Sequence, residues 1–396
     1  MKILFVTTRN VATTSGELRL IKSRACAMRE HFSIDTHFIS YIDRERVRGI
    51  NADSINTDFE TVYVQYSKDN PISYLSNLRL FENSVLEVLQ NERDIGVVII
   101  SGAVHPRLVN RLKNIRTVKI IVDIHGAIEE LMEYQHPKGQ FFSRLFYQYL
   151  RWIQKKQLSL ADGAMVVSES LKQHVISSNP VPKGFRFFII PCSTKRSRLS
   201  IQEYWDNRSV WRDRLGVAEH ECLFIYSGGA SQWQMVTETI DLYREISSKL
   251  SRKSSLLLMS HRIDEIKSQV KGDTTNLIFK KYPHDVVPNV LCAGDFAFLL
   301  RDESITNTVA FPNKFLEYVI SLNYVIATPF VRSVAELIVK HDCGEIYHGC
   351  ADDLIRKLEM RMLSPKNVAT FDTLLDETGY HNTLVSFKEF VSRTGI

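Results

Sequence analysis

Short β-branched segments alternate with longer amphipathic segments along the whole chain, and this alternation limits the possible fold more than any other feature. A strand, a helix and a further strand form a parallel unit, so the pattern is typical of α/β proteins with parallel sheets. We predict strands at 3–7, 36–39, 62–65, 97–100, 118–123, 163–167 and 187–190, then a second series at 222–227, 255–259, 277–280, 296–300, 324–327 and 345–347.

A polar, irregular stretch at 191–196 separates the two series of strands. The chain has 396 residues, enough for two or three domains at about 150 residues per domain. We therefore predict an α/β protein with two Rossmann-like, doubly wound domains, residues 1–192 and 193–380, that face each other across a cleft. A last helix within 381–396 has no following strand, and we expect it to cross back and pack on the N-terminal domain.

Composition excludes several classes of protein. The apolar runs are strand-sized, far below the roughly 20 residues that a membrane span requires, and the apolar start at 3–6 is too short for a secretory signal. We therefore expect a cytoplasmic protein. The net charge of +5 fits an anionic substrate or membrane surface but is too small to indicate nucleic acid. The six cysteines lack the spacing of metal ligands, and we expect them to be reduced.

The most informative local motif begins at Pro312. Proline suits the first turn of a helix, which places Asn313 and Lys314 where main-chain N–H groups and the helix dipole attract anions. Lys314, Glu317 and Tyr318 share one helix face because they are three and four residues apart. A base and a carboxylate above a sheet suit a ligand that combines phosphate with sugar hydroxyls. The alternative is an ordinary solvated pair of charges.

Two further signals follow strands of the second series. Gly228 and Gly229 come directly after the strand 222–227, where main-chain N–H groups can form an anion-binding nest, and Trp233 can cover a planar base. Arg301 ends the strand 296–300, where its guanidinium can clamp a diphosphate. An ordinary turn and an exposed strand-end arginine are the alternatives.

The first series has two candidates of its own. Gly16 lies in the loop 8–16, close to the start of the helix 18–31, and allows the backbone to approach a ligand. No G-x-G-x-x-G motif follows the first strand, so the dinucleotide fingerprint is absent. His125 stands just past the strand 118–123, at the edge where α/β folds bind ligands. A structural histidine is the alternative.

The segment 141–156 mixes aromatic and basic residues, and no acid occurs between Glu133 and Asp162. Such a helix can lie on an anionic bilayer with its aromatic side chains at the headgroup level. A core helix with a basic solvent face fits the segment equally well.

The order of these motifs from 227 to 329 resembles the C-terminal half of GT-B glycosyltransferases of family 4, closest to bacterial members that build surface polysaccharides. The motifs are Ser-Gly-Gly with Trp-Gln, Leu-Leu-Arg-Asp, Phe-Pro-Asn-Lys-Phe-Leu-Glu-Tyr and Val-Ile-Ala-Thr-Pro. The N-terminal half is compatible, with Gly16, Asp-Ile-His-Gly at 123–126 and Val-Val-Ser-Glu-Ser-Leu at 166–171.

This resemblance implies that the C-terminal domain binds a nucleotide diphosphate sugar and the N-terminal domain binds the acceptor. Glu317 would bind the ribose hydroxyls, His125 would approach the donor sugar, and Gly16 would lie beside the diphosphate or the acceptor. The diphosphate would be held by Gly228, Gly229, Asn313 and Lys314.

The family needs no metal, which agrees with the lack of an Asp-x-Asp motif, so we expect no cofactor. Many members carry a further glutamate eight positions before the second, where this chain has Val309. We therefore expect donor-sugar contacts from the backbone around Asn307–Phe311, and positive charge at the diphosphate from Arg301 and Lys314.

The resulting hypothesis is a retaining glycosyltransferase that serves bacterial cell-surface polysaccharide biosynthesis, such as capsule or O-antigen, with a saccharide or polyprenyl-diphosphate-linked acceptor. It would work in the cytoplasm or peripherally at the inner face of the cell membrane, with 141–156 as the membrane contact. Two alternatives stay open: a nucleotide-sugar 2-epimerase of the same fold, and an inactive scaffold protein that binds a nucleotide sugar.

Overall fold

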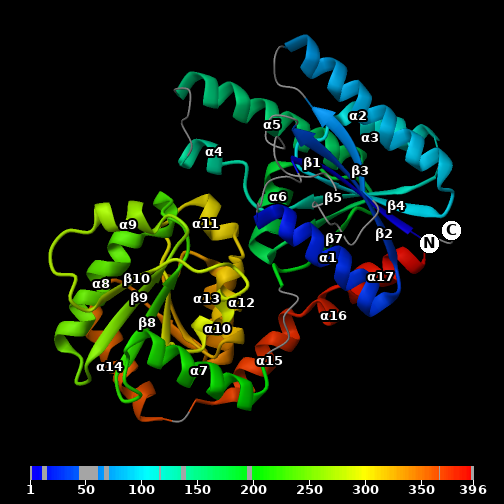
Figure 1. Ribbon diagram of the computed structural model, residues 1–396. Helices are drawn as coiled ribbons and strands as arrows, with labels where there is room; N and C mark the ends of the chain where they lie inside the picture. The colour runs from blue at the N-terminus through cyan, green and yellow to red at the C-terminus, as the bar shows by residue number, and fades with distance from the viewer. Residues whose placement is uncertain are drawn as a thin grey trace. The chain divides into compact units, whose positions relative to one another are not determined.

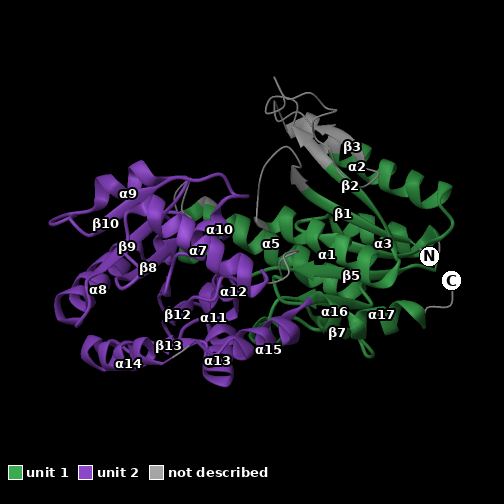
Figure 2. Cartoon of the chain, turned by 60° about the horizontal axis from the view of Figure 1, so that its bottom comes forward, with its two compact units in different colours: residues 1–193, 380–396 green, residues 194–379 purple. Residues whose placement is uncertain are grey.

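The computed structural model describes residues 2–10, 16–43, 61–66, 71–115, 117–134, 140–193, 199–364 and 366–393. The fold divides into two compact units, one of residues 1–193 with 380–396 and one of residues 194–379 (Figures 1 and 2). Each unit is built on its own parallel sheet. Residues 11–15 of the first predicted loop and 194–198 of the predicted interdomain stretch lie outside the described residues.

Unit 1 contains a seven-stranded sheet in which all neighbouring strands are parallel. The strand order is β3-β2-β1-β4-β5-β6-β7, so the chain winds outward from β1 in one direction and from β4 in the other. The strands are β1 (Lys2–Asn10), β2 (Asp35–Asp43), β3 (Thr61–Tyr66), β4 (Ile95–Ser101), β5 (Lys119–Ile124), β6 (Gly163–Val166) and β7 (Arg186–Ile189).

The helices of unit 1 pack on this sheet, and the last two come from the C-terminal end of the chain. Phe387 stacks edge-on against Phe188, with ring centroids 5.2 Å apart, and Leu384 is fully buried in the same apolar core. The helices are α1 (Gly16–Phe32), α2 (Pro71–Asn91), α3 (Pro106–Ile115), α4 (Glu130–Glu133), α5 (Gln140–Leu160), α6 (Glu169–Ser178), α16 (Tyr380–Thr383) and α17 (Val385–Ser392).

Unit 2 contains a six-stranded parallel sheet in the order β10-β9-β8-β11-β12-β13, the strand order of a Rossmann domain. Its strands are fully buried at the centre, as parallel sheets covered on both faces are. They are β8 (Cys222–Ser227), β9 (Ser254–Met259), β10 (Leu277–Lys280), β11 (Phe296–Leu299), β12 (Tyr324–Ala327) and β13 (Gly344–Ile346).

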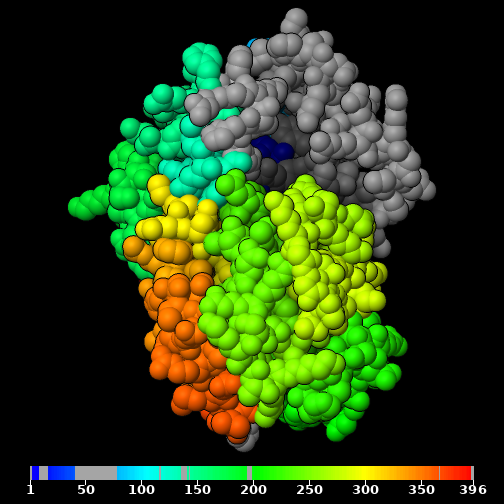
Figure 3. Space-filling view, turned by 90° about the vertical axis from the view of Figure 1, so that its left-hand side faces the viewer, coloured from blue at the N-terminus to red at the C-terminus, as the bar shows by residue number. Residues whose placement is uncertain are grey.

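A stack of aromatic rings forms the middle of this core, with Phe224 lying 5.4 Å from Phe296 and 5.5 Å from Phe298. Figure 3 shows one face of the unit, where α14 in orange adjoins α8 in yellow-green. The helices are α7 (Ile201–Leu215), α8 (Val236–Lys249), α9 (Ile263–Gln269), α10 (Val287–Leu291), α11 (Ile305–Val309), α12 (Asn313–Ile320), α13 (Arg332–His341), α14 (Ala351–Leu363) and α15 (Val368–Thr378), with a short 3₁₀ turn at Gln232–Gln234.

The predicted fold class, two Rossmann-like doubly wound α/β domains, is confirmed, and each predicted strand coincides with an observed one. The largest difference is at β2, which continues to Asp43 instead of ending at Ile39. Main-chain pairing explains the extension, because the β1–β2 register runs on to Asn10 and Tyr41, beyond the apolar residues. The single helix predicted within 381–396 is in fact two, α16 and α17, interrupted at Leu384.

Two properties of the described residues complete the picture. No helix among them combines the length and apolar character that crossing a bilayer requires. All six cysteines have free thiols, five of them buried and Cys350 exposed.

Candidate active site

In both sheets the strand order reverses next to the first strand, between β1 and β4 and between β8 and β11. Parallel α/β sheets bind ligands outside the carboxyl ends of their strands at such a point. The predicted site residues lie at or near these edges: Gly16 and His125 in unit 1 and the remainder in unit 2.

In unit 2, the predicted helix start is present as α12. Pro312 is extended, with φ −66° and ψ 128°, so it precedes the helix, and Asn313 is the first helical residue. The Lys314 Nζ atom lies 2.6 Å from Glu317 Oε2 on the half-buried first turn. Their side chains are 28% and 13% exposed, so both charges remain accessible to a ligand.

Tyr318 attaches this helix to the end of β8. Its ring is buried, and its hydroxyl accepts a hydrogen bond from the Ser227 N–H at 2.9 Å. Burial raises the pKa of this phenol, and the nearby Glu317 carboxylate raises it further, so the hydroxyl stays protonated. The bond fixes the start of α12 next to the loop that follows Ser227.

The Gly228-Gly229 turn is held closely by its own neighbours. A Cβ atom on Gly228 would lie 2.8 Å from the Tyr226 hydroxyl, and one on Gly229 would lie 2.9 Å from Gln234 Oε1. The Tyr226 hydroxyl donates to the Gly229 carbonyl at 2.7 Å, and the Gly228 N–H donates to the Met259 carbonyl at 3.0 Å. Since the Gly228 N–H belongs to the sheet, the predicted nest for an anion begins at Gly229.

Arg301 lies at the end of β11, as predicted, but it is a buried residue. Its Nη1 atom donates to the Leu300 carbonyl at 2.7 Å. The Thr328 hydroxyl accepts from the Arg301 N–H at 2.9 Å and donates to the Arg301 carbonyl at 2.7 Å. Its positive charge lowers the pKa of the buried Tyr226 and Tyr318 phenols, against the larger opposing effect of burial. Arg301 therefore places positive charge near Tyr226, whose hydroxyl is bonded to the glycine turn.

Asn307 and Trp233 occupy different surroundings. Asn307 is buried in α11, and its Nδ2 atom donates to both the backbone carbonyl, at 3.0 Å, and the carboxylate of Asp302. It thus shapes the loop that leads from β11 to α12. Trp233 lies half-buried in the 3₁₀ turn after the glycines. Val309 is buried and apolar, in the position where a carboxylate was expected from the resemblance.

In unit 1, His125 belongs to a group of four charged residues, called here the His125 cluster: Glu17, Arg24, Asp123 and His125. His125 Nε2 lies 2.8 Å from Asp123 Oδ2, a short ion pair without the alignment of a linear hydrogen bond, and Nδ1 lies 3.6 Å from Glu17 Oε1. Arg24 pairs with the other Asp123 oxygen and donates to the Ile190 carbonyl. Arg24 and Asp123 are fully buried.

The charges of the His125 cluster stabilise one another. Burial raises the pKa of Asp123, but Arg24 and His125 lower it more, to about 2. Burial lowers the pKa of His125, but Asp123 and Glu17 outweigh that effect and the pKa is raised above its ordinary value. The two carboxylates therefore favour the charged form of His125, in which both ring nitrogens are hydrogen-bond donors.

The His125 cluster opens into a cavity of about 550 Å³ within unit 1. Gly102, at the end of β4, has φ +81° and leaves room for Thr8, which a Cβ atom would approach to 2.9 Å. The amide of Gln157, on α5, donates to the Gly102 and Val104 carbonyls at 3.2 and 2.7 Å. The cavity is thus lined by the strand-end turns on one side and by α5 on the other.

Sequence reasoning missed Glu17 and Arg24. A signal for Arg24 was present, because it falls between Ile21 and Met28 on the apolar stripe of α1, where an unpaired charge would be costly. Glu17 is the second residue of the helix that begins at Gly16, so it brings that predicted position close to His125. No group of three or more metal-ligating side chains was found in the ranges that the structure describes.

Neither a protein-family model nor a curated protein sequence matches this chain. Solved structures do. A glycosyltransferase from Rickettsia africae ESF-5 is 14% identical and matches with a TM-score of 0.70, over 99% of this chain and 98% of that one. HepE from Anabaena, solved with UDP and glucose, is 13% identical, with a TM-score of 0.67 over 99% and 100% of the two chains.

The fold is GT-B. The lipopolysaccharide outer core galactosyltransferase WaaB also matches, at 13% identity, with a TM-score of 0.64 over 99% of this chain and 100% of that one. At such identities the likeness concerns the arrangement of the backbone alone. The GT-B assignment therefore stands on full-length agreement with several glycosyltransferase structures, and the chemistry must be argued from this chain's own residues.

Proposed function

We propose that this GT-B protein is a retaining, family 4-like glycosyltransferase that moves a hexose from a nucleotide diphosphate sugar to a saccharide or polyprenyl-diphosphate-linked acceptor. The observation that carries the proposal is the accessible Lys314–Glu317 pair on the first turn of α12, attached by Tyr318 to the glycine turn after β8. A cation, a helix start and a carboxylate at one sheet edge match the phosphate and hydroxyl groups of such a donor.

Each donor group has a matching element in unit 2. The ribose hydroxyls would donate to the Glu317 carboxylate, and the diphosphate would accept from Lys314, Asn313 and the main chain from Gly229 onward. Half-buried Trp233 would lie against the base. Solved GT-B neighbours support a donor of this class, since HepE structures contain UDP and UDP-glucose.

Catalysis in this proposal consists of stabilising the leaving diphosphate. Lys314 and the buried charge of Arg301 would offset its developing negative charge, and His125 would contribute a hydrogen-bond donor to the reaction. The bond between the sugar C1 atom and the phosphate oxygen would break, and the acceptor oxygen would bond to C1 on the same face. The departing phosphate oxygen would take the acceptor's proton. Full turnover in the presence of EDTA is the expected result, and loss of turnover that Mg²⁺ restores would contradict the metal-independent scheme.

The acceptor would enter the unit 1 cavity of about 550 Å³, beside the His125 cluster. Two of the solved neighbours are WaaG, a glycosyltransferase involved in lipopolysaccharide biosynthesis, and WaaB, a lipopolysaccharide outer core galactosyltransferase. They support a place in bacterial cell-surface polysaccharide biosynthesis for this chain. The setting would be the cytoplasm, at the inner face of the cell membrane.

The membrane contact in this proposal is α5. Phe146, Tyr149 and Trp152 form a continuous ring-on-ring ridge with centroids 6.4 and 6.2 Å apart, and these side chains are 39% to 51% exposed. Exposed bases flank the ridge, while the opposite face packs into unit 1 through Ile153 and Leu158. The exposed bases are Arg144, Arg151, Lys155 and Lys156. An aromatic ridge between bases complements an anionic bilayer.

Liposome flotation tests this contact. Binding to vesicles that contain phosphatidylglycerol, little binding to phosphatidylcholine vesicles, and loss of binding in the Arg151→Gln/Lys155→Gln variant are expected. The matched control is Lys253→Gln, an exposed base in unit 2. Flotation that is indifferent to lipid charge would remove the membrane role.

A panel of UDP-, GDP-, ADP- and CMP-sugars tests the function itself, with binding measured by calorimetry and turnover by release of the nucleotide. Lys314→Ala and Glu317→Ala should weaken donor binding, while Lys357→Ala, which removes a comparable exposed pair with Asp353, should not. Unchanged donor binding in both α12 variants would contradict the assignment of the donor site to the first turn of α12. Sugar isomerisation without an acceptor would identify an epimerase, and binding without turnover would identify a scaffold.

A further inference from the structure

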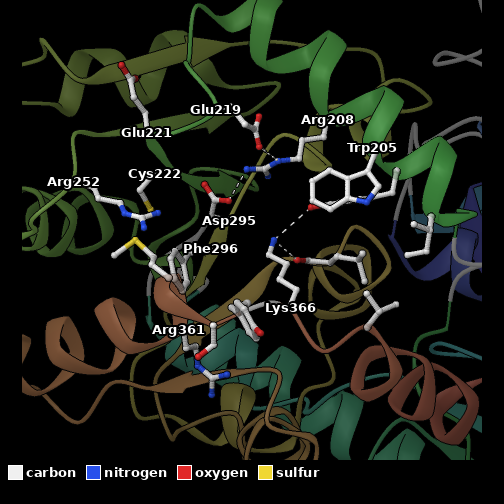
Figure 4. Close-up of a pocket in the computed structure, with 17 residues that line it drawn as sticks. Trp205, Arg208, Glu219, Glu221, Cys222, Arg252, Asp295, Phe296, Arg361 and Lys366 are labelled. Carbon is white, nitrogen blue, oxygen red and sulfur yellow. Dashed lines mark hydrogen bonds and ion pairs between the residues drawn. The ribbon is translucent and has the colours of Figure 1, made fainter.

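Unit 2 has a cavity of its own, of about 370 Å³ (Figure 4). It lies at the opposite edge of the sheet from the first turn of α12. It lies at the amino ends of β8, β11 and β12, where Cys222, Phe296 and Tyr324 begin those strands. The remaining walls come from α7, the end of α14, the segment that joins α14 to α15, and the turns before β8 and β9. No residue of the proposed donor site lines it, so it is a separate site.

The carboxylates of this cavity are already paired. Glu219 lies 2.8 Å from Arg208 Nε, Asp295 lies 2.9 Å from Arg208 Nη2, and Glu221 lies 2.6 Å from Lys253 Nζ. Most of the negative charge that faces the cavity is therefore matched by buried or neighbouring cations.

Two cations of the cavity have no such partner. Arg252 is exposed, and neither it nor Lys366 forms an ion pair with a carboxylate of the described residues. The Lys366 ammonium donates to the Leu322 carbonyl at 2.8 Å and lies 3.5 Å from the Tyr204 hydroxyl and the Gly294 carbonyl. In Figure 4 it lies at the centre of the cavity, with Arg252 and Trp205 on either side.

Aromatic side chains supply the apolar part of the cavity. The Lys366 ammonium lies 6.0 Å from the Tyr204 ring centre and 5.9 Å from that of Tyr324. Trp205, at the margin of the cavity, is 52% exposed, so much of its apolar ring surface is in contact with solvent. Flat rings beside an ammonium and a guanidinium suit a ligand in which an anionic group is attached to a ring.

The local fold holds these groups in place. α7 begins with a capping box between Ser200 and Glu203 and ends at Gly216 in the left-handed conformation, so both of its ends are satisfied. The helix is therefore a rigid support for Trp205. The cavity volume lies within the range of about 300–1,000 Å³ that small-molecule sites occupy.

We propose that this cavity binds a phosphate monoester carried on a ring, such as a sugar phosphate or a nucleoside monophosphate. The phosphate would lie between Lys366 and Arg252, and the ring would lie against Trp205. Lys366 also donates to the carbonyl of Leu322, two residues after the end of α12, the helix whose start is the proposed donor site.

The ammonium of Lys366 makes this binding sensitive to pH. Burial lowers the pKa of Lys366 to about 8, the Asp295 and Cys222 groups raise it, and Arg208 and Arg212 lower it. The Tyr204 hydroxyl and Tyr324 ring complete its surroundings. Since Lys366 attracts phosphate only in its protonated form, the affinity for the ester should fall as pH rises through about 8.

Calorimetric titration of the full chain with glucose 6-phosphate and with AMP tests the proposal, with glucose, adenosine and inorganic phosphate as partial ligands. Saturable binding of at least one ester, tighter than that of its two fragments, is expected. Lys366→Met and Arg252→Ala should each weaken it by about tenfold or more, because each removes a charged hydrogen bond. Lys357→Ala is the control on the neighbouring helix.

The outcomes separate this site from the proposed donor site. Absence of binding by both esters, or binding of inorganic phosphate as tight as that of the esters, would overturn the proposal. So would binding that survives Lys366→Met and Arg252→Ala but is lost in Glu317→Ala, which places the ester at α12's first turn. Arg252 is exposed, so its replacement keeps the test valid even if Lys366→Met unfolds the protein.

Discussion

The His125 cluster and the Lys314–Glu317 pair both place opposite charges at the carboxyl edge of a parallel sheet, yet they differ in burial. Arg24 and Asp123 are inaccessible to solvent, whereas the side chains of Lys314 and Glu317 are 28% and 13% exposed. Buried charges require partners in the folded protein itself, so the cluster is part of the structure before any ligand arrives. The Lys314–Glu317 pair is partly exposed, so it contributes less to stability, and both side chains can exchange their mutual contact for contacts with a ligand.

We expect the largest effect when the buried Arg24–Asp123 ion pair is broken. Arg24→Met leaves the Asp123 carboxylate buried without its main partner, and we expect a loss of about 3–5 kcal/mol in the free energy of unfolding. Urea denaturation of the variant measures this. Arg19→Met, an exposed arginine on the same helix, should change stability by less than about 0.5 kcal/mol. Equal effects for the two arginines would contradict a structural role for the cluster.

The next effect concerns chemistry rather than stability. His125→Gln removes the imidazolium, and we expect kcat for sugar transfer to fall by about 100-fold, the usual result of removing one charge-stabilising donor. His174→Gln is a matched control, since His174 also pairs with a glutamate of unit 1, at 3.2 Å from Glu129. Equal turnover in the two variants would mean that His125 only supports the fold.

For the Lys314–Glu317 pair we expect the reverse: a small effect on stability and a clear effect on ligand binding. Lys314→Ala and Glu317→Ala should change the free energy of unfolding by less than about 1 kcal/mol, as solvent-accessible ion pairs do. Donor affinity should fall by about tenfold in each, since each loses a charged hydrogen bond to the ligand. Calorimetry measures the donor affinity, and thermal unfolding of the same samples measures the stability. A loss of stability as large as that of Arg24→Met would contradict the proposal that the Lys314–Glu317 pair serves binding rather than folding.

The smallest effect is a dependence on pH. The pKa of His125 is raised in the folded protein, so its contribution to stability is fully present below the unfolded value of about 6.5 and is lost as pH rises through the folded value. The stability difference between the wild type and His125→Gln should therefore shrink as pH rises above about 6.5. Urea midpoints measured below and above that pH report it, and a difference that grows with pH would contradict the assigned ion pairs.

The strands were predictable because burial imposes a simple pattern on the sequence. A strand covered on both faces needs a short continuous apolar run, such as Val97–Ile100 or Phe296–Leu299, and each run stands out between polar turns. Pro312 likewise marked the start of α12 to within one residue. The ends of β1 and β2 were harder to predict, since pairing continues through polar residues there.

The candidate site was predictable only where the chain brings its parts together locally. Lys314 and Glu317 are three residues apart on one helix, so their contact follows from helical geometry. The contact of Asp123 with Arg24 joins residues 99 positions apart, and that of Ser227 with Tyr318 joins residues 91 apart. No local pattern specifies such pairs, although the position of Arg24 on an apolar stripe shows that it must find a partner.

Local sequence patterns were enough to predict two parallel α/β sheets, the strand-end positions of His125 and Arg301 and the charged first turn of α12, because periodicity and turn chemistry act over a few residues. What each charge faces depends on tertiary packing. It placed His125 between two carboxylates, directed Arg301 to its own main chain, assigned the Gly228 N–H to the sheet and left Lys366 beside Trp205 in a cavity. Burial and distance set the energy of a charge, and both arise only when distant segments pack together.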